Sequence, residues 1–306
     1  MPGTTGQLPY LAHDAVIIGI DAGGSATRAR AVACGELLGD GKGGPGNPLA
    51  TDSQTLSASY AAALAGYPEP DYVAACVSGT ESTQQHIRIS ELLNTIFPNA
   101  IVQVHPDYVA AVTAAPAGAD LVVIAGTGSL VCSRTPDGDY VTSGGRGWIL
   151  GDFGSAARLG RSALEWFCDD TTAASPEFNA DAGNLLGTSD WRSVLTALRA
   201  TPSPAAFLAS AAPLLTRAVA RGERWAAIRL EAEMSMLAAT AARHIERHLR
   251  QQKTTQVALS GGVWHSREAE ICFTAAMTRT IPGSVIARSS LSPLEGAVRI
   301  AERMAG

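Results

Sequence analysis

Ile18-Gly19-Ile20-Asp21-Ala22-Gly23-Gly24-Ser25-Ala26-Thr27 joins an apolar run to a glycine turn. The residues from Ala15 to Ile20 are nearly all apolar or β-branched, which predicts a strand buried on both faces. A second strand is expected over Thr27–Cys34. The two strands would form a hairpin closed by the turn.

The chemistry of this turn suits a phosphate ligand. Gly23 and Gly24 let the backbone come close to a ligand, and Ser25 and Thr27 add hydroxyl donors. Asp21 lies at the mouth of the turn, where a lone carboxylate suits Mg²⁺ held largely through water and bound to a nucleotide's phosphates. The alternative is a tight hairpin with a surface aspartate.

Two more buried strands run into paired glycines further along the chain. Leu121–Ala125 leads to Gly126-Thr127-Gly128-Ser129, and Gln256–Ser260 leads to Gly261-Gly262-Val263. Strand, glycine turn and strand thus occur twice, which we interpret as an internal duplication, with two unrelated hairpins as the alternative. Three such turns in this order indicate a nucleotide site.

The rest of the chain alternates predicted helices and strands. Residues 39–48, rich in glycine and proline, are expected to form a flexible loop. The other expected elements are helices at 53–65, 82–93, 108–115, 155–167, 224–250 and 293–304, and strands at 72–77, 101–104 and 130–135. Residues 169–220 carry no motif. The pattern predicts an α/β fold.

Composition excludes several classes of function. With 23 Lys and Arg against 28 Asp and Glu, the net charge is -5, so no nucleic-acid or anionic-membrane partner is expected. The five cysteines form no CxxC pair, which argues against a metal site and disulfides. His244 and His248 fall one helical turn apart and are read as a surface pair. No signal peptide or membrane span is read, and we expect a cytoplasmic protein.

The three turns together resemble the actin, hexokinase and heat-shock chaperone superfamily. The resemblance implies two actin-like domains of like topology, each a mixed sheet flanked by helices, with ATP in the cleft between them. It assigns the turns at residues 21–27 and 126–129 to the phosphates and Gly261, Gly262 and Val263 to the adenosine. The expected first domain is 1–116 plus the C-terminal helix 293–306, and the second is 117–292.

A fourth motif narrows the resemblance. Gly144-Gly145-Arg146-Gly147-Trp148-Ile149-Leu150-Gly151-Asp152-Phe153-Gly154-Ser155 resembles the signature of N-acetylglucosamine kinases and the related BadF/BcrA-type ATPases. It departs from the common form at Phe153, where an acid is usual, and at Arg146 and Ile149. In a sugar pocket, Gly147 would allow close approach, Trp148 would offer a flat face and Asp152 would accept hydrogen bonds. A structural loop with Trp148 in the core is the alternative.

The same resemblance supplies a catalytic base and two further sugar contacts. Asp107 follows the strand at 101–104, where the kinases carry an aspartate that accepts the proton of the attacking hydroxyl. The alternative is that Asp107 only caps a helix. Asn47 and Ser78 match positions near the sugar, although Asn47 also suits a turn before Pro48.

The resemblance therefore predicts an ATP- and Mg²⁺-dependent kinase acting on the 6-hydroxyl of an amino sugar, foremost N-acetylglucosamine. It also implies a homodimer. Glucosamine or glucose kinase activity is the first alternative. The others are an activator ATPase, which would need cysteine-bound iron–sulfur clusters, and a sugar-sensing regulator, which would need a DNA-binding helix-turn-helix.

Overall fold

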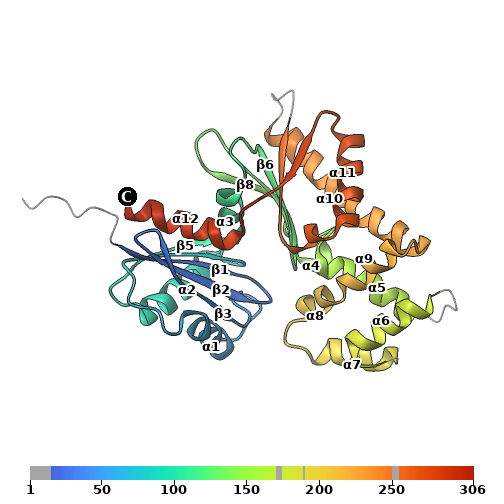
Figure 1. The fold of residues 1–306 in the computed structure, drawn as a ribbon, viewed down its shortest axis with the longest axis horizontal. Helices are drawn as coiled ribbons and strands as arrows, with labels where there is room; N and C mark the ends of the chain where they lie inside the picture. Colours follow the sequence, from blue (N-terminus) through green and yellow to red (C-terminus); the bar gives the residue numbers. More distant parts are fainter. Residues whose placement is uncertain (1–14, 170–173, 189, 250–254) are drawn as a thin grey trace, which may run out of the picture.

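The structure is a computed structural model that describes residues 15–169, 174–188, 190–249 and 255–306. Within these residues it contains two five-stranded mixed sheets flanked by helices (Figure 1). This is the two-domain architecture expected from the sequence. None of the described helices is long and apolar enough to cross a membrane.

The first sheet has the order β3-β2-β1-β4-β5. Its first three strands are antiparallel, and β4 and β5 run parallel to β1. The strands are β1 (Val16–Ala22), β2 (Thr27–Ala33), β3 (Glu36–Gly43), β4 (Tyr72–Val77) and β5 (Ile101–Pro106). Side chains of β1 alternate between two covered faces, as the apolar run predicts.

The second sheet repeats this arrangement with the order β10-β9-β6-β7-β8. Again three strands are antiparallel, and two run parallel to the central strand. The strands are β6 (Leu121–Ala125), β7 (Ser129–Arg134), β8 (Tyr140–Gly144), β9 (Gln256–Ser260) and β10 (Val285–Arg288). The shared strand order supports the duplication read from the two glycine hairpins.

Helices cover the first sheet on both faces. On one face α1 (Ser53–Leu64) and α2 (Thr83–Ile96) pack against Ile18 and Ile20. On the other lie α3 (Asp107–Ala114) and α12 (Pro293–Ala305), next to Ile17. Figure 1 shows α3 and α12 on the side of this sheet that faces the second one.

Helix α3 contacts both sheets. Ala110 packs in the cluster under the first sheet, and Ala111 packs with Val122 and Ala258 of the second. Helix α12 comes close to β1 and α3 because glycines stand at the contacts, since a Cβ at Gly19 or Gly296 would collide with the opposing backbone. Helix α3 therefore lies between the two sheets, and its first residue, Asp107, is at one end of this contact.

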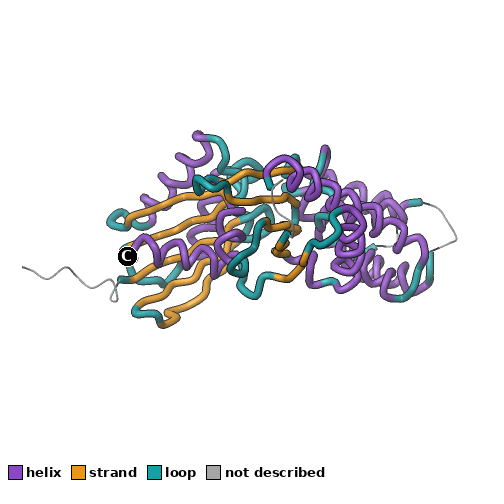
Figure 2. The backbone as a smooth tube through the Cα atoms, turned by 90° about the horizontal axis from the view of Figure 1, so that it is seen from above, coloured by secondary structure: helices purple, strands orange, loops and turns teal. Residues whose placement is uncertain are grey.

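Residues 147–248, which lie between β8 and β9 in the sequence, are mostly helical. These helices lie on the side of the second sheet that is away from the first sheet (Figure 2). The set comprises α4 (Gly147–Leu150), α5 (Ala156–Cys168), α6 (Pro176–Leu186), α7 (Trp191–Ala200), α8 (Pro204–Ser210), α9 (Ala212–Ala220) and α10 (Arg224–His248). The 3₁₀ turn η2 (Gly262–His265) and α11 (Arg267–Thr280) follow β9. They share one apolar core with β6, β7 and β9. This part includes the motif-free residues 174–188 and 190–220.

One expected element is wrong. Residues 39–48 were expected to be a flexible loop, but Gly39, Gly41 and Gly43 belong to β3. Helix α1 packs so closely on this strand that a Cβ at Gly41 would collide with the carbonyl of Ala63, and one at Gly43 with that of Ser59. The glycines mark a close approach of backbones rather than a flexible segment.

Candidate active site

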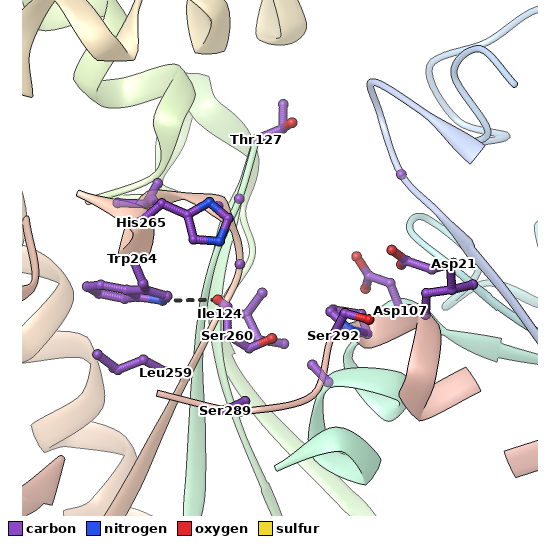
Figure 3. Close-up of a pocket in the computed structure, with 18 of the residues that line it drawn as sticks. Asp21, Asp107, Ile124, Thr127, Leu259, Ser260, Trp264, His265, Ser289 and Ser292 are labelled. Atoms are coloured by element: carbon purple, nitrogen blue, oxygen red, sulfur yellow. Dashed lines mark hydrogen bonds between the residues drawn. The ribbon is translucent and has the colours of Figure 1, made fainter. Parts of the chain in front are cut away.

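A cleft of about 730 Å³ opens between the two sheets. Parts of all three glycine turns line it, together with Asp21, Asp107 and residues 288–295, which run from the end of β10 into the first turn of α12. Figure 3 shows Asp21 and Asp107 on one side, with Thr127, Ser260 and His265 on the other. Segments far apart in the sequence therefore meet around one space.

The two glycine hairpins touch across this cleft. The hydroxyls of Ser25 and Thr127 lie 3.0 Å apart, within hydrogen-bond distance. Each turn is closed by a short backbone hydrogen bond, from Gly23 N to Ala26 O and from Gly126 N to Gly128 O, both 2.9 Å. A ligand entering here meets the backbone of both domains.

The glycines of these turns fall into two groups. At Gly23, Gly24, Gly126 and Gly262 an added Cβ would meet nothing within 4 Å, and φ is not positive. Neither the backbone nor the packing demands glycine there, so the open space beside these residues suits the close approach of a ligand.

Other glycines of the same motifs serve the fold. Gly261 has φ +107°, and a Cβ there would collide with the carbonyl of Ala125. A Cβ at Gly128 would come within 2.8 Å of Asp152 Oδ2. Beside Gly261, the indole of Trp264 donates to Val123 O and Ser260 O, at 3.2 and 3.0 Å, and fixes the third turn on the sheet. Val263 is buried at the same turn and lines the cleft.

Asp107 is the first residue of α3 and stands in the cleft. The hydroxyl of Ser78 lies close enough to its carboxylate to lower its pKa. Ser78 is tied to the first hairpin by its own N–H, which donates to Ala22 O at 2.9 Å. Asn47 Nδ2 lies 3.5 Å from Ser78 Oγ. Asn47, Ser78 and Asp107 thus form a chain of polar groups beside the first hairpin.

The electrostatics favour proton uptake at Asp107 near neutral pH. Burial raises the pKa of Asp107 to about 7, helped by the negative charges of Asp21 and Glu81. The Tyr108 N–H and the Ser78 hydroxyl oppose the shift. Burial also raises the pKa of Asp21, and the neighbouring Arg28 lowers it. An acid with a pKa close to the working pH is suited to general-base chemistry.

The fourth motif forms the loop between β8 and α5. Asp152 has φ +52° and is buried, and its Oδ1 accepts a hydrogen bond from Gly147 N at 3.0 Å. Backbone N–H groups of Arg146 and Ser129 also stabilise its carboxylate, while burial raises its pKa. Asp152 therefore joins the loop to the second hairpin. Trp148 packs partly buried against the second core, and Gly147 is exposed.

Two predicted hydroxyl donors also point into the fold. Thr27 is buried, and its hydroxyl donates to Gly44 O at 3.0 Å. Ser129 Oγ donates to Phe153 O at 2.8 Å. Neither residue lines the cleft, and neither do Gly128, Asn47, Ser78, Gly147, Trp148 or Asp152.

Sequence reasoning missed an ion pair that holds the fourth motif. Glu233 of α10 is buried, binds Arg158 with a shortest distance of 2.8 Å and accepts from Gly154 N at 3.1 Å. Arg158 also covers the ring of Phe153, with its guanidinium carbon 5.0 Å from the ring centre. No spacing in the sequence links these residues, because the contact spans 75 positions.

Sequence reasoning also missed that residues 288–295, from the end of β10 to the first turn of α12, line the cleft. Ser292 and Glu295 form a capping box at the start of α12, with Pro293 at its first position. The helix start itself was predicted correctly at residue 293, and the pattern Ser-x-x-Glu with proline after the serine marks it.

The chain resembles known proteins in sequence and in fold. The family model of the BadF/BadG/BcrA/BcrD ATPases covers residues 18–301. A search of curated proteins found no match.

Solved structures share the fold over almost the whole chain. A provisionally named N-acetylglucosamine kinase from Chromobacterium violaceum is 26% identical, with a TM-score of 0.69 over 94% of this chain and 99% of that one. One from Porphyromonas gingivalis is 20% identical with the same TM-score and coverage. A ROK family glucokinase from Streptomyces griseus, in complex with glucose and AMPPNP, is 16% identical, with a TM-score of 0.64 over 94% of this chain and 99% of that one.

Proposed function

Because the chain belongs to the BadF/BadG/BcrA/BcrD ATPase family, we propose that it is an ATP-dependent N-acetylglucosamine kinase that phosphorylates the sugar's 6-hydroxyl. One observation carries this proposal. Asp107, whose pKa is raised to about 7, stands in the same cleft as both glycine hairpins. A base facing a phosphoryl donor is the arrangement that phosphoryl transfer to an alcohol requires.

The hairpins would hold the phosphates of ATP through their open glycines and the hydroxyls of Ser25 and Thr127. The turn at Gly261, Gly262 and Val263 would contact the adenosine. The carboxylate of Asp107 accepts the proton of the attacking hydroxyl as its oxygen bonds to the γ-phosphorus and the bond to ADP breaks. Closure of the two domains around the ligands would exclude water from the transfer.

The surroundings of Asp21 fit a magnesium ion. The carboxylate lines the cleft beside the first hairpin and has a loose ion pair with Arg28, at 3.6 Å. A hard, oxygen-only ligand suits Mg²⁺ held through water and phosphate. When bound, the ion would neutralise charge that develops on the phosphates.

The amino sugar is proposed from two kinds of support. The Chromobacterium violaceum and Porphyromonas gingivalis structures carry that name provisionally. Ser78 lies near Asp107, and Asn47 lies 3.5 Å from Ser78, behind the residues that line the cleft. A sugar hydroxyl that reaches past Asp107 would meet them. Gly147, Trp148 and Asp152 would reach the sugar only if the loop moves, because Asp152 is held by backbone N–H groups in this structure. The homodimer stays a prediction.

A coupled assay of ADP release with N-acetylglucosamine, glucosamine, glucose and N-acetylmannosamine tests the substrate. We expect the highest kcat/KM with N-acetylglucosamine and a product phosphorylated at O6, identified by phosphorus NMR. A higher kcat/KM with glucosamine or glucose would mean that this sugar, and not N-acetylglucosamine, is the preferred substrate. No sugar-dependent ADP release with any of the four would contradict the kinase proposal.

A further inference from the structure

We propose that Arg28 binds the phosphates of the nucleotide, exchanging its ion pair with Asp21 for a pair with a phosphate oxygen. The proposal rests on the ATP-binding function proposed for this cleft. Arg28 is the second residue of β2 and pairs directly with Asp21 across the β1–β2 ladder. Its position follows from the hairpin that builds the first glycine turn.

The ion pair of Arg28 is loose and open to solvent. Arg28 Nη1 lies 3.6 Å from Asp21 Oδ2, and 57% of the Arg28 side chain is exposed, against 17% of Asp21. Arg28 lines the cleft. Guanidinium carries five N–H donors, so most remain free for a ligand that enters beside the first hairpin. A bidentate Arg–phosphate pair is stronger than this single long contact.

Arg30, two residues further on the same face of β2, shows the contrast. Its Nε and Nη2 donate to the two carboxylate oxygens of Asp40 at 2.7 and 2.8 Å. Arg30 is therefore satisfied within the sheet and does not line the cleft. The two arginines lie on the same face of the same strand. They differ because Arg30 has two short hydrogen bonds to its aspartate, whereas Arg28 has one long contact.

The charges that line the cleft leave a bound polyphosphate in need of an unpaired cationic side chain. Among the described residues that line it, the acids are Asp21, Asp107 and Glu295, and the arginines are Arg28 and Arg288. Arg288 donates from both Nε and Nη2 to Glu270, with the Nε contact at 2.7 Å. A polyphosphate beside Asp21 and Asp107 would be repelled, and Arg28 is the arginine placed to offset this repulsion.

Titration calorimetry with ADP and adenosine, in EDTA and without sugar, tests the proposal. We expect Arg28→Met to weaken ADP binding about 10- to 100-fold, the range for one charged hydrogen-bonded contact. Adenosine has no phosphate, so its binding should not change. Arg28→Lys should lie between wild type and Arg28→Met, because a lysine keeps the charge and loses the planar fork. Arg30→Met is the matched control and should bind ADP like wild type.

Exchange of partners predicts a second signature. Asp21→Asn releases the guanidinium and should tighten Mg²⁺-free ADP binding more in the chain with Arg28 than in Arg28→Met. Equal tightening in both backgrounds would contradict the exchange.

The proposal is overturned if Arg28→Met, with an unchanged thermal midpoint, binds ADP like wild type or loses ADP and adenosine equally. If the methionine variant does not fold, wild-type ADP affinity in Arg28→Gln overturns it in the same way. These titrations contain no sugar. A wild-type chain that binds ADP but phosphorylates no sugar would therefore contradict the kinase and leave the result for Arg28 standing.

Discussion

The raised pKa of Asp107 has a direct kinetic consequence. A base must be deprotonated to accept the hydroxyl proton, and the pKa of Asp107 is about 7. At subsaturating ATP, log kcat/KM should rise with slope one below pH 7 and level off above it. A pH profile that stays flat from pH 5.5 to 8.5 would contradict this assignment.

A change at Glu81 should shift the acid limb of the pH profile, which is the rise of log kcat/KM below pH 7. Its charge is one of the causes that raise the pKa of Asp107, and its side chain is exposed. Glu81→Gln removes the charge, so the acid limb should move to lower pH. Glu91→Gln changes another exposed acid of the first domain and should leave the profile in place. An identical response of both variants would refute a specific effect of Glu81.

For single residues, the sequence predicted that glycines of three turns and Asp107 would share one cleft, and they do; their roles stay predictions. A glycine turn that follows an apolar strand can be recognised in a single sequence. It could not show that Asp152, with φ +52°, turns its carboxylate toward Gly147 N, or that Thr27 and Ser129 bond inward. Side-chain direction in such loops depends on long-range contacts that leave no spacing in the sequence.

Among the elements, the loop before α5 depends on α10. Glu233→Gln would leave Arg158 without its charge partner and weaken the acceptor of Gly154 N. Because Arg158 is 20% exposed and Glu233 9%, we expect a loss of about 2–3 kcal/mol, at or below the low end for a broken buried pair. Urea denaturation measures it.

Glu165→Gln is the matched control. It breaks two exposed pairs, with Arg161 on α5 and with Arg229 on α10, and should cost about 1 kcal/mol or less. A similar loss in both variants would mean that the Glu233 pair does not stabilise the loop beyond an ordinary surface pair.

Two glycine-to-alanine changes should act in opposite directions. Gly296→Ala places a Cβ against the carbonyl of Ala110 where α12 crosses α3, and should destabilise by about 1–3 kcal/mol. In α6, a Cβ at Gly183 meets only Thr188 O, at 4.0 Å, so Gly183→Ala should stabilise by about 0.5–1 kcal/mol. Unfolding midpoints compare the two, and a stabilised Gly296→Ala would refute the close crossing.

The sequence failed to predict strand β3 because its glycines, like Gly296, mark a close backbone contact. Gly41 and Gly43 have the composition of a loop, yet the packing of α1 makes them part of a strand. The buried strands β4 and β6 were predicted with the observed boundaries, because an apolar run bounded by polar residues carries the signal by itself.

For the whole molecule, both domains should respond to one nucleotide. The hydroxyls of Ser25 and Thr127 meet across the cleft, so a bound nucleotide would contact both hairpins. Hydrogen exchange should slow in residues 21–27 and 124–129 when Mg²⁺ and ADP bind, because a ligand that binds the native state suppresses its opening. Protection of one hairpin alone would place the nucleotide on a single domain.

The family resemblance implied the two-domain plan, and the repeated strand and turn were consistent with it. The same strand order in both sheets agrees with that plan. We propose the boundary between residues 116 and 117, in the connection between α3 and β6. The helices of residues 174–220 were not predicted, because their burial in the second core depends on tertiary packing.

Transfer by wild type and Asp107→Asn, measured with N-acetylglucosamine and ATP alongside ADP affinity, tests most directly whether this cleft sets a base against a bound nucleotide. We predict that kcat falls about 100- to 10,000-fold while ADP affinity stays at or above the wild-type value. Transfer that continues at the wild-type rate in Asp107→Asn would contradict the account.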